Sequence, residues 1–412
     1  MQEPHNPYDM PEHADDVYVQ KIQVNLAYPV YFTRHVFDLD NPVLANAIAL
    51  TPPQTRVLVY VDSGVAQCSP DLLSDITRYT EQYAPRIALV RRPCIIAGGE
   101  RAKNSWHKAR DIVETIGDHQ LDRHSTVIAV GGGAVLDTVG FAVSLVHRGL
   151  RLIRIPTTVL AQNDAGIGVK TGINAQGTKN FLGTFAAPFA VINDPAFLTT
   201  LDEPHWRGGI AEAFKVALIK DADFFDFLCT HARHLRDRDM DAMVQLIRRC
   251  AQIHLDHIRS GGDPFETGNT RPLDFGHWSA HRLETLSDFT IGHGQAVAIG
   301  IALDACYASR TGHLGPNGLE RLLAGLSAVG LPTWSAYLDQ RNVEGRLDIL
   351  DGIEQFREHI GGPLCITLPH SIGKSCEVHD LDPVIIESCI QYLKDRWEND
   401  ADREQQAPHV LP

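Results

Sequence analysis

Apolar residues follow two different periodicities along the chain. From Val17 to about Asp194, short runs rich in β-branched residues alternate with stretches whose apolar residues recur every three or four positions. The expected strands are RVLVYVDSGV, RIALVRRP, STVIAVGGG, RLIRIPTT and FAVINDP, and the expected helices are Pro70–Tyr83, Ala102–Ile116 and Ala134–Val146. Such alternation predicts an α/β layer with a mostly parallel sheet, which we assign to a domain over residues 1–196.

Helical spacing dominates after Pro195, and it predicts a second, mainly α-helical domain over residues 197–412. One late strand is expected at Leu364–Leu368. The expected helices are Phe197–Thr200, Trp206–Lys220, Ala222–Arg236, Asp239–Arg259, Trp278–Ser287, Gln295–Thr311, Gly318–Val329, Asn342–Ile360 and Asp382–Trp397.

The composition is that of a soluble globular protein, with 44% hydrophobic and 21% charged residues. The net charge of −14 argues against nucleic acid or an anionic membrane as a partner, because both favour a basic surface. The eight cysteines include no CxxC pair, which is typical of reduced thiols. The acidic, proline-rich start is unlike a signal peptide, and no apolar run has transmembrane length. We therefore expect a cytoplasmic protein.

A histidine-rich segment is the strongest candidate for a metal site. His277 and His281 are four residues apart, so a helix places both imidazoles on one face. Glu284 follows them, and His293 opens the next apolar run. Borderline divalent metals favour several imidazoles with a carboxylate from elsewhere. Because the chain contains 20 histidines, the alternative is that these residues are structural, but three at this spacing favour a site.

A glycine-rich turn in STVIAVGGGAVLDTVGF predicts a phosphate-binding site. Gly131, Gly132 and Gly133 lie between an expected strand and an expected helix, whose N-terminus offers free amides. This is not the GxGxxG fingerprint, and an ordinary tight turn is the alternative. Asp137, one turn into that helix, is a candidate for a hydroxyl contact. Other polar residues favour the nucleotide interpretation: Asp62 ends an earlier expected strand, Glu100 and Lys103 lie in a polar turn, and Thr157 and Thr158 follow a further expected strand.

Two further groups of charged residues are candidates for chemistry. Glu212 and Lys215 are three apart on an otherwise apolar expected helix, where burial is costly unless each is paired or bound to a metal. A weak surface ion pair is the alternative. Downstream of Arg148, a glycine-rich stretch expected to be flexible would complete a convergent anion site for a phosphorylated substrate. Its residues are Asp164, Lys170, Lys179 and Asn180.

Taken in order, these motifs resemble the dehydroquinate synthase superfamily, the NAD-dependent sugar phosphate cyclases. The resemblance runs from about residue 60 to 310. It is carried by GGGAVLDTVGF, by HRG at 147–149, PTTVLAQND at 156–164, GVKTG at 168–172 and KN at 179–180, and by AEAFK at 211–215, GHWSAH at 276–281 and HGQAVAIG at 293–300. The family implies a Rossmann-like dinucleotide-binding domain, a helical domain, an active site in the cleft and a homodimer.

The resemblance also assigns roles by motif. Glu212, His277 and His293 would bind a divalent metal, zinc or cobalt. Residues that would face a phosphorylated sugar are Asp164, Lys170, Lys215 and His281 as catalytic groups, with Arg148, Lys179, Asn180 and Arg271 as substrate-binding groups. NAD would contact Asp62, Glu100, Lys103, Gly131, Gly132, Gly133, Asp137, Thr157, Thr158 and Thr200.

The implied reaction oxidises a secondary alcohol, eliminates phosphate, returns the hydride and closes a carbocycle by an aldol step, so that NAD is regenerated. Two other interpretations remain open. A metal-dependent polyol dehydrogenase of the glycerol dehydrogenase type would share the glycine turn and the histidines, but would have less need for the phosphate-binding residues. A non-catalytic descendant is the third interpretation.

The sequence departs from dehydroquinate synthases where a Lys and an Arg usually bind the substrate carboxylate. Ile253 or Asp256 stands near the expected Lys, and Thr270 stands at the expected Arg, with Arg271 one residue away. Asp274 replaces the usual Asn, and Trp278–Ser279 replace Thr-Phe. The R-P-x-D-x-GHW run resembles sedoheptulose 7-phosphate cyclases of the valiolone type. Sedoheptulose 7-phosphate is therefore the leading candidate, and a dehydroquinate synthase in which Arg271 binds the carboxylate is the alternative.

Overall fold

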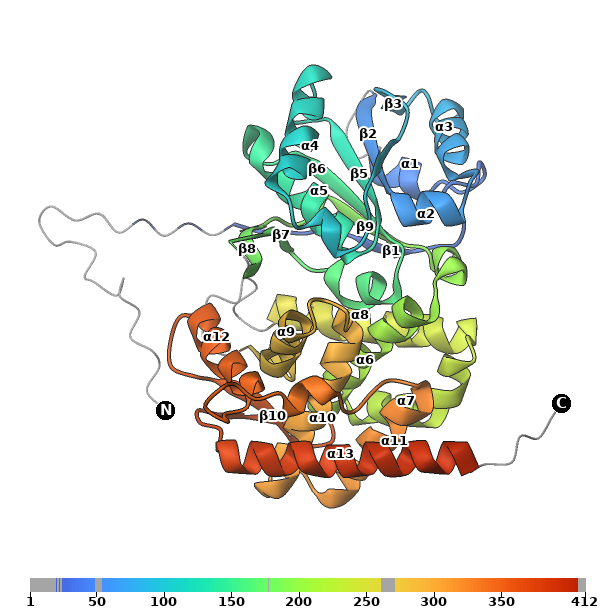
Figure 1. Ribbon diagram of the computed structural model, residues 1–412. Helices are drawn as coiled ribbons and strands as arrows, with labels where there is room; N and C mark the ends of the chain where they lie inside the picture. The colour runs from blue at the N-terminus through green and yellow to red at the C-terminus, as the bar shows by residue number, and fades with distance from the viewer. Residues whose placement is uncertain are drawn as a thin grey trace, which may run out of the picture.

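A computed structural model describes residues 20, 22, 24–48, 54–176, 178–260 and 271–406. The chain forms a sheet with helices in one half and a mainly helical assembly in the other, as the blue-green and yellow-red parts of Figure 1 show. The combination of a parallel sheet and a helical half that the periodicity predicts is confirmed.

The described residues form one seven-stranded sheet in the order β1-β9-β6-β5-β2-β3, with β4 also pairing with β2. Every pairing in it is parallel. The strands are β1 Val30–Phe32, β2 Thr55–Asp62, β3 Ile87–Leu89, β4 Cys94–Ile96, β5 Thr126–Gly131, β6 Arg151–Pro156 and β9 Ala190–Asn193. The five expected strands are present. The three-residue strands β1 and β4 were not expected, because so short a run carries no periodicity of its own.

Both faces of the sheet are covered by helices, as a parallel sheet requires. Along β2, Leu58 and Tyr60 pack under α4 and α5, whereas Val57, Val59 and Val61 pack under α1 and α3. The helices of this half are α1 Val43–Ile48, α2 Ser63–Cys68, α3 Leu72–Gln82, α4 Trp106–Asp118 and α5 Gly133–Leu145, with short turns η1 Glu100–Ala102, η2 Val146–Arg148 and η3 Ala161–Ala165.

The strand order reverses between β2 and β5. The chain passes from β2 to β3 and β4 on one side, and then crosses to β5 on the other side of β2. In open α/β sheets, ligands bind at the carboxyl edge of the strands at such a reversal. Asp62 ends β2 and Gly131 ends β5, so the fold brings two predicted nucleotide residues to this point.

The glycine-rich stretch after η3 is an antiparallel hairpin, β7 Lys170–Ala175 and β8 Thr178–Phe185, and not the flexible segment expected from its composition. A Cβ on Gly172 would lie 2.8 Å from the Leu182 carbonyl oxygen, and one on Gly183 would lie 2.9 Å from the Thr171 carbonyl oxygen. The glycines therefore allow close strand pairing, which composition does not distinguish from a loop.

The second half is built from helices around one large core. After η4 Pro195–Thr200, inside which the predicted domain boundary falls, come α6 Glu203–Lys220, α7 Ala222–Arg236, α8 Met240–Ser260, η5 Pro272–Asp274, α9 His277–Leu286, α10 His293–Arg310, α11 Pro316–Val329, η6 Ala336–Asp339, η7 Asp348–Leu350, α12 Asp351–Ile360 and α13 Pro383–Gln406. Among the described helices, none is both long and apolar enough to cross a membrane.

Two expectations for this half need correction. The helix expected from Asn342 begins only at η7, because a turn closed by the bridge between Arg341 and Leu347 precedes it. The late strand is β10 Ile366–Ser371, and it pairs with an unexpected β11 Lys374–Val378. The burial of β11 is only partial, so its apolar signal is weak.

Glycine pairs set the helix spacing around the predicted metal residues. A Cβ on Gly294 of α10 would lie 2.2 Å from the Cα of Gly208 in α6. A Cβ on Gly300 of α10 would lie 2.1 Å from the carbonyl oxygen of Gly276, the N-cap of α9. Helices α6, α9 and α10 therefore approach one another more closely than larger residues would allow.

Replacing Gly294 with Ala should destabilise the protein by about 1–3 kcal/mol, because the methyl group forces α6 and α10 apart. Denaturant unfolding measures this loss. Gly117→Ala in α4 is the matched control, since a Cβ there meets nothing within 4 Å, and it should be neutral or slightly stabilising. Equal stability of the Gly294→Ala variant and the wild type would contradict the role given to this crossing.

Candidate active site

Glu212, His277 and His293 converge from α6, α9 and α10. The Nε2 atoms of His277 and His293 lie 3.6 and 3.5 Å from Oε1 of Glu212. One donor atom from each of the three residues lies within 4.8 Å of the others. The helix crossings at the glycine pairs bring these side chains, which are up to 81 residues apart in sequence, to one point.

Hydrogen bonds on the far side of both rings fix their orientation. The Nδ1 atom of His277 lies 3.1 Å from the Phe275 carbonyl oxygen, and the Nδ1 atom of His293 lies 3.1 Å from Oε2 of Glu284. Both partners only accept, so each Nδ1 carries a proton and each Nε2 atom faces Glu212, with a free lone pair unless it carries a second proton. Supporting acceptors of this kind are usual behind metal-binding histidines.

Two lone pairs directed at a carboxylate oxygen repel it unless a positive charge lies between them. Burial lowers the pKa of His277 to about 3, aided by the nearby Lys215. Burial also opposes charge on His293, but Glu284 outweighs it and raises the pKa of His293 to about 9. A proton on His293 thus occupies the position that suits a cation.

The carboxylate of Glu212 is fully buried, and neither of its oxygens accepts a hydrogen bond from the described residues. The Lys215 ammonium lies 2.5 Å from Oε2. Although burial opposes ionisation, Lys215 holds the pKa of Glu212 well below its usual range. An ionised, buried carboxylate with Oε1 unsatisfied fits a cation ligand.

His281, Glu284 and His293 form a second group with donor atoms within 4.8 Å of one another. It fits a cation less well, because Glu284 already accepts from Lys179 at 2.7 Å and from His293. The charge of Glu284 is thereby compensated, whereas Oε1 of Glu212 has no donor. His281 lies beside both metal candidates, with ring centroids 5.3 Å from His277 and 6.0 Å from His293.

Asp164 is held by a histidine that sequence reasoning did not find. The Nε2 atom of His254, from α8, lies 2.8 Å from Oδ1 of Asp164. Burial opposes ionisation of Asp164, but His254 lowers its pKa below the ordinary value. Asp164 is presented by the π-helical turn η3, a feature often found at functional sites. The sequence did contain a signal for this residue, because His254 continues the helical spacing of the buried Leu246, Ile247 and Cys250.

The carboxyl edge of the sheet forms a cradle at the glycine turn. A Cβ on Gly131 would lie 3.0 Å from the Cβ of Asp62, one on Gly132 3.2 Å from Thr158, and one on Gly133 3.2 Å from Ala165. Gly132 is the N-cap of α5 and has no side chain to cap it, so the first amides of α5 remain available to a phosphate.

The remaining predicted nucleotide residues lie around this cradle. Thr157 is buried and its amide donates to Gly131. Thr200 is exposed at the end of η4, which packs against α2 directly after Asp62. The buried ammonium of Lys103 lies 2.7 Å from Asp137 and also contacts the side chain of Asn180.

The residues expected to form a convergent anion site have different partners in the structure. Lys179 is paired with Glu284, and Asn180 turns to Lys103 at the nucleotide edge. Lys170 is exposed at the start of β7. Arg148 is exposed beyond the end of α5, whose 13 residues separate it by about 20 Å from Gly133. Matching sequence motifs fixes which residues are present but not where their side chains point.

The residues near the expected carboxylate-binding positions are also placed by the structure. Ile253 packs partly buried against the core, and Asp256 is paired with Arg259. Nη1 of Arg271 lies 4.0 Å from Asp274. The pKa of Lys215 is raised mainly by Glu212, and Asp274 adds to that effect. Thr270 lies outside the described residues.

Asp304 is a second residue that sequence reasoning missed. Buried in α10, its two carboxylate oxygens accept from Trp278 Nε1 at 2.8 Å and from the Gly276 amide at 2.9 Å. Burial raises the pKa of Asp304 to about 7. The carboxylate therefore fixes the residues on both sides of His277, and an acid inside an apolar helical run was the signal for it.

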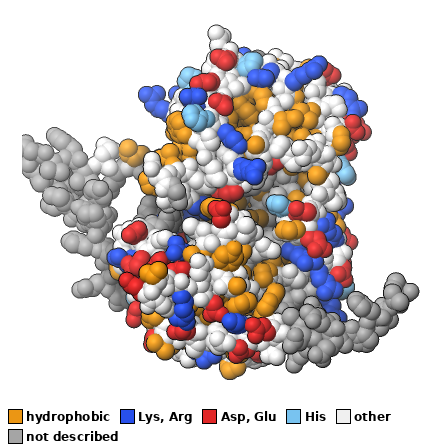
Figure 2. Space-filling model, viewed as in Figure 1, with side chains coloured by type: hydrophobic (Ala, Val, Ile, Leu, Met, Phe, Trp, Pro, Cys, Tyr) orange, Lys and Arg blue, Asp and Glu red, His pale blue; other side chains and the backbone are white. Residues whose placement is uncertain are grey.

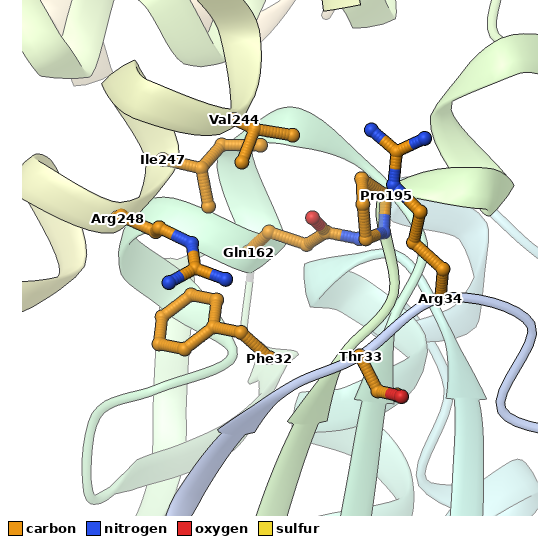
Figure 3. A pocket seen from close by; sticks show the side chains of 8 residues that line it. All are labelled: Phe32, Thr33, Arg34, Gln162, Pro195, Val244, Ile247 and Arg248. Carbon is orange, nitrogen blue, oxygen red and sulfur yellow. The ribbon is translucent and has the colours of Figure 1, made fainter. Parts of the chain in front are cut away.

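The surface is indented between the two halves, with charged side chains along the rim (Figure 2). A separate pocket of about 260 Å³ opens between β1, η3 and α8 (Figure 3). Its lining includes Phe32, Arg34 and Arg248, whose guanidinium lies 4.9 Å from the Phe32 ring centroid. No predicted site residue lines this pocket.

Comparison with known proteins decides the family. The model of the 3-dehydroquinate synthase N-terminal domain matches residues 93–208, and that of the C-terminal domain matches residues 209–350. The chain belongs to the 3-dehydroquinate synthase family. This membership confirms the resemblance found in the motifs and makes the protein a sugar phosphate cyclase.

Relatives of this chain include 3-dehydroquinate synthases and 2-epi-5-epi-valiolone synthases. A 3-dehydroquinate synthase from Halorhodospira halophila is 34% identical over 87% of this chain and 94% of its own length. A 2-epi-5-epi-valiolone synthase from Actinoplanes is 32% identical over 90% and 92%. The solved 2-epi-5-epi-valiolone synthase of Streptomyces hygroscopicus subsp. jinggangensis, with NAD+ and Zn2+ bound, superposes with a TM-score of 0.82 at 30% identity, over 92% of this chain and all of that one.

Asp304→Ala should weaken Zn2+ binding about 10–100-fold, because His277 loses the carboxylate that fixes its backbone. It should also cost about 1–3 kcal/mol of stability, since the Trp278 and Gly276 donors lose their partner. Calorimetric titration with Zn2+ and denaturant unfolding measure the two effects.

Asp339→Ala is the matched control, because Asp339 is a half-exposed acid of the same half, paired with Lys394. It should leave Zn2+ affinity unchanged. If Asp304→Ala lowered stability but bound Zn2+ as the wild type does, Asp304 would have no part in positioning His277.

Proposed function

We propose that this protein uses a tightly held NAD and one divalent cation, zinc or cobalt, to cyclise a phosphorylated keto-sugar. The observation that supports this best is the buried Glu212, whose Oε1 faces the Nε2 atoms of His277 and His293. The turn η3 connects this cluster to the nucleotide cradle. Its Ala165 lies close to Gly133 of the cradle, and the neighbouring Asp164 adds to the effect of Glu212 in raising the pKa of Lys215.

Glu212, His277 and His293 would hold the cation, and Asp62 and Gly131–Gly133 would hold the ribose and phosphates of NAD. When bound, the two cofactors allow a secondary alcohol to be oxidised and later restored, which labilises a neighbouring C–H bond in between. An acid beside the ribose would also disfavour the extra phosphate of NADP by charge repulsion.

The residues of the chain would orient the sugar. Asp164 stays ionised beside His254, so it can accept a hydrogen bond from a substrate hydroxyl. The Lys215 ammonium, buried between Glu212 and Asp164, keeps its proton and can donate to a substrate oxygen. His281 stays neutral because burial and the adjacent His277 hold its pKa well below the ordinary value, so it can accept or relay a proton.

The balance of charge suits an anionic substrate. Around the cluster, the carboxylates of Glu212 and Glu284 are matched by the ammonium groups of Lys215 and Lys179. A cation that replaces the His293 proton would leave the imidazoles neutral, and its double charge would then make the pocket positive. A phosphate dianion would therefore be attracted into it, with Lys170 and Arg148 as further candidates for its binding.

The substrate we favour is sedoheptulose 7-phosphate, which would yield a cyclitol precursor. Its support is the region where dehydroquinate synthases bind a carboxylate. Here Asp274 lies 4.0 Å from Arg271, so a substrate carboxylate would meet a negative charge beside that guanidinium. The homodimer, the cytoplasmic location and the division at residue 196 remain predictions.

Glu212→Gln tests the cation site. The variant keeps the shape of the side chain but loses its charge, so we expect loss of bound metal and a fall in phosphate release of at least about 100-fold. Glu320→Gln is the control, because Glu320 pairs with Arg396 at the surface and the change should leave activity intact. Accumulation of NADH in amounts matching the sugar consumed would contradict the cyclase and favour the polyol dehydrogenase.

Comparison of two substrates tests the second part of the proposal. Without a Lys and Arg pair for the acid, the heptulosonate phosphate should lose about 2–5 kcal/mol of binding relative to a true dehydroquinate synthase. Phosphate release at matched concentrations should favour sedoheptulose 7-phosphate by about 30-fold or more in kcat/KM. Efficient turnover of the heptulosonate that Arg271→Ala abolishes, and that the exposed Arg259→Ala preserves, would identify a dehydroquinate synthase.

A further inference from the structure

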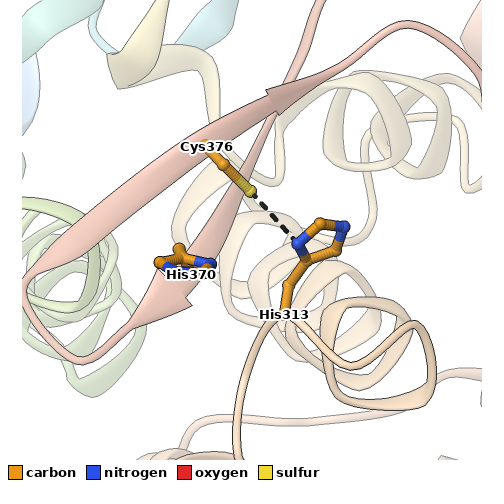
Figure 4. A group of neighbouring side chains, drawn as sticks. All are labelled: His313, His370 and Cys376. Carbon is orange, nitrogen blue, oxygen red and sulfur yellow. Dashed lines mark hydrogen bonds between the residues drawn. The ribbon is translucent and has the colours of Figure 1, made fainter.

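A third group of metal-ligating side chains lies in the helical half and shares no residue with the Glu212 cluster. His313 lies in the turn between α10 and α11, His370 lies on β10, and Cys376 lies on β11. One donor atom from each residue lies within 4.8 Å of the other two. The three side chains face a common space (Figure 4).

The spacing of these donors matches a metal site better than a chance contact. The Nδ1 atom of His313 lies 3.7 Å from the Sγ atom of Cys376. Tetrahedral zinc with ordinary Zn–N and Zn–S bonds separates a nitrogen and a sulfur ligand by about 3.6 Å. The histidine and cysteine therefore already stand at the separation that zinc requires.

The backbone holds all three residues on anchored elements. In the β10–β11 ladder, Cys376 lies opposite Leu368, and a bulge interrupts the register between Pro369 and Ser371, at His370. A bulge re-aims the side chain that it carries. The hairpin turn is fixed to α6, since the Gly373 amide donates to Leu218 at 2.7 Å. The His313 amide donates to Ala308 in α10 at 2.8 Å.

The donor set is also selective. Two imidazoles and one thiolate suit zinc and disfavour magnesium or calcium, which prefer oxygen. Zinc binds cysteine as a thiolate, so the bound cation would displace the thiol proton to solvent. His370 is exposed, which leaves a path for the ion.

We propose that His313, His370 and Cys376 bind a zinc-class divalent cation, with water or another ligand in the fourth position. The ion would fasten the β10–β11 hairpin to the turn between α10 and α11. This site shares no residue with the Glu212 cluster, and it does not depend on the proposed function. Its role would be structural, because it would join two segments of the helical half.

Cobalt substitution of the whole protein distinguishes the two sites. Only Cys376 supplies sulfur, so a thiolate-to-Co2+ charge-transfer band in the near ultraviolet reports on this site alone. We expect two retained metal ions per chain and this band in the wild type and in Cys94→Ser, a half-buried control cysteine. Cys376→Ser and His313→Ala should retain one ion and lose the band. Glu212→Gln should retain one ion and keep the band.

A measurement on the wild type alone guards against variants that fail to fold. Alkylation of the metal-free protein with iodoacetamide, followed by peptide mass spectrometry, should label Cys376, and added Zn2+ should reduce that labelling at least tenfold while leaving the exposed Cys68 labelled. One ion per wild-type chain without the charge-transfer band, or labelling of Cys376 that Zn2+ does not change, would overturn the proposal.

Discussion

The buried carboxylate of Glu212 is the charge around which the helical half is arranged. A single ionised carboxylate at zero exposure is costly unless positive charge lies against it. Lys215 compensates one oxygen from the same helix, and the other oxygen faces two imidazoles whose Nδ1 atoms are held by acceptors on their far sides. The arrangement therefore favours a cation at this buried point. Removing one partner would leave the others uncompensated.

Contacts between glycines allow the close helix crossings that bring the charged side chains together. The Gly208–Gly294 contact lets α6 and α10 meet, and the Gly276–Gly300 contact brings the start of α9 to α10. Without these contacts the two Nε2 atoms would not reach Glu212. Asp304 then accepts from the Gly276 amide and from the Trp278 indole, on either side of His277. Backbone approach and a buried hydrogen bond thus determine side-chain positions several residues away, so the ligand geometry is set mainly by the packing of the helices.

Sequence patterns predicted the long, periodic elements and the chemistry of isolated motifs, but not how side chains pair across them. The sheet strands and most helices were predictable because their burial imposes a period. The grouping of Glu212 with His277 and His293 followed from the resemblance to the family's motifs. His254, by contrast, pairs with Asp164, which is 90 residues away in the sequence, and the residues around His254 do not indicate that partner. Likewise Lys179 and Asn180 are adjacent in sequence but turn to Glu284 and Lys103, because a strand alternates its side chains.

These ion pairs also bear on how enzymes with the same family motifs could distinguish between sugar substrates. In the proposed function, charged groups of the site are already compensated within the chain: His254 pairs with Asp164, and Lys179 pairs with Glu284. Arg271 likewise has Asp274 as a partner, 4.0 Å away. A ligand would therefore displace or join an existing pair, and its charge would decide which is favourable. A phosphate would compete for Lys179, whereas a carboxylate near η5 would meet Asp274. Discrimination between sugars would then rest on α8 and η5, outside the motifs that carry the family resemblance.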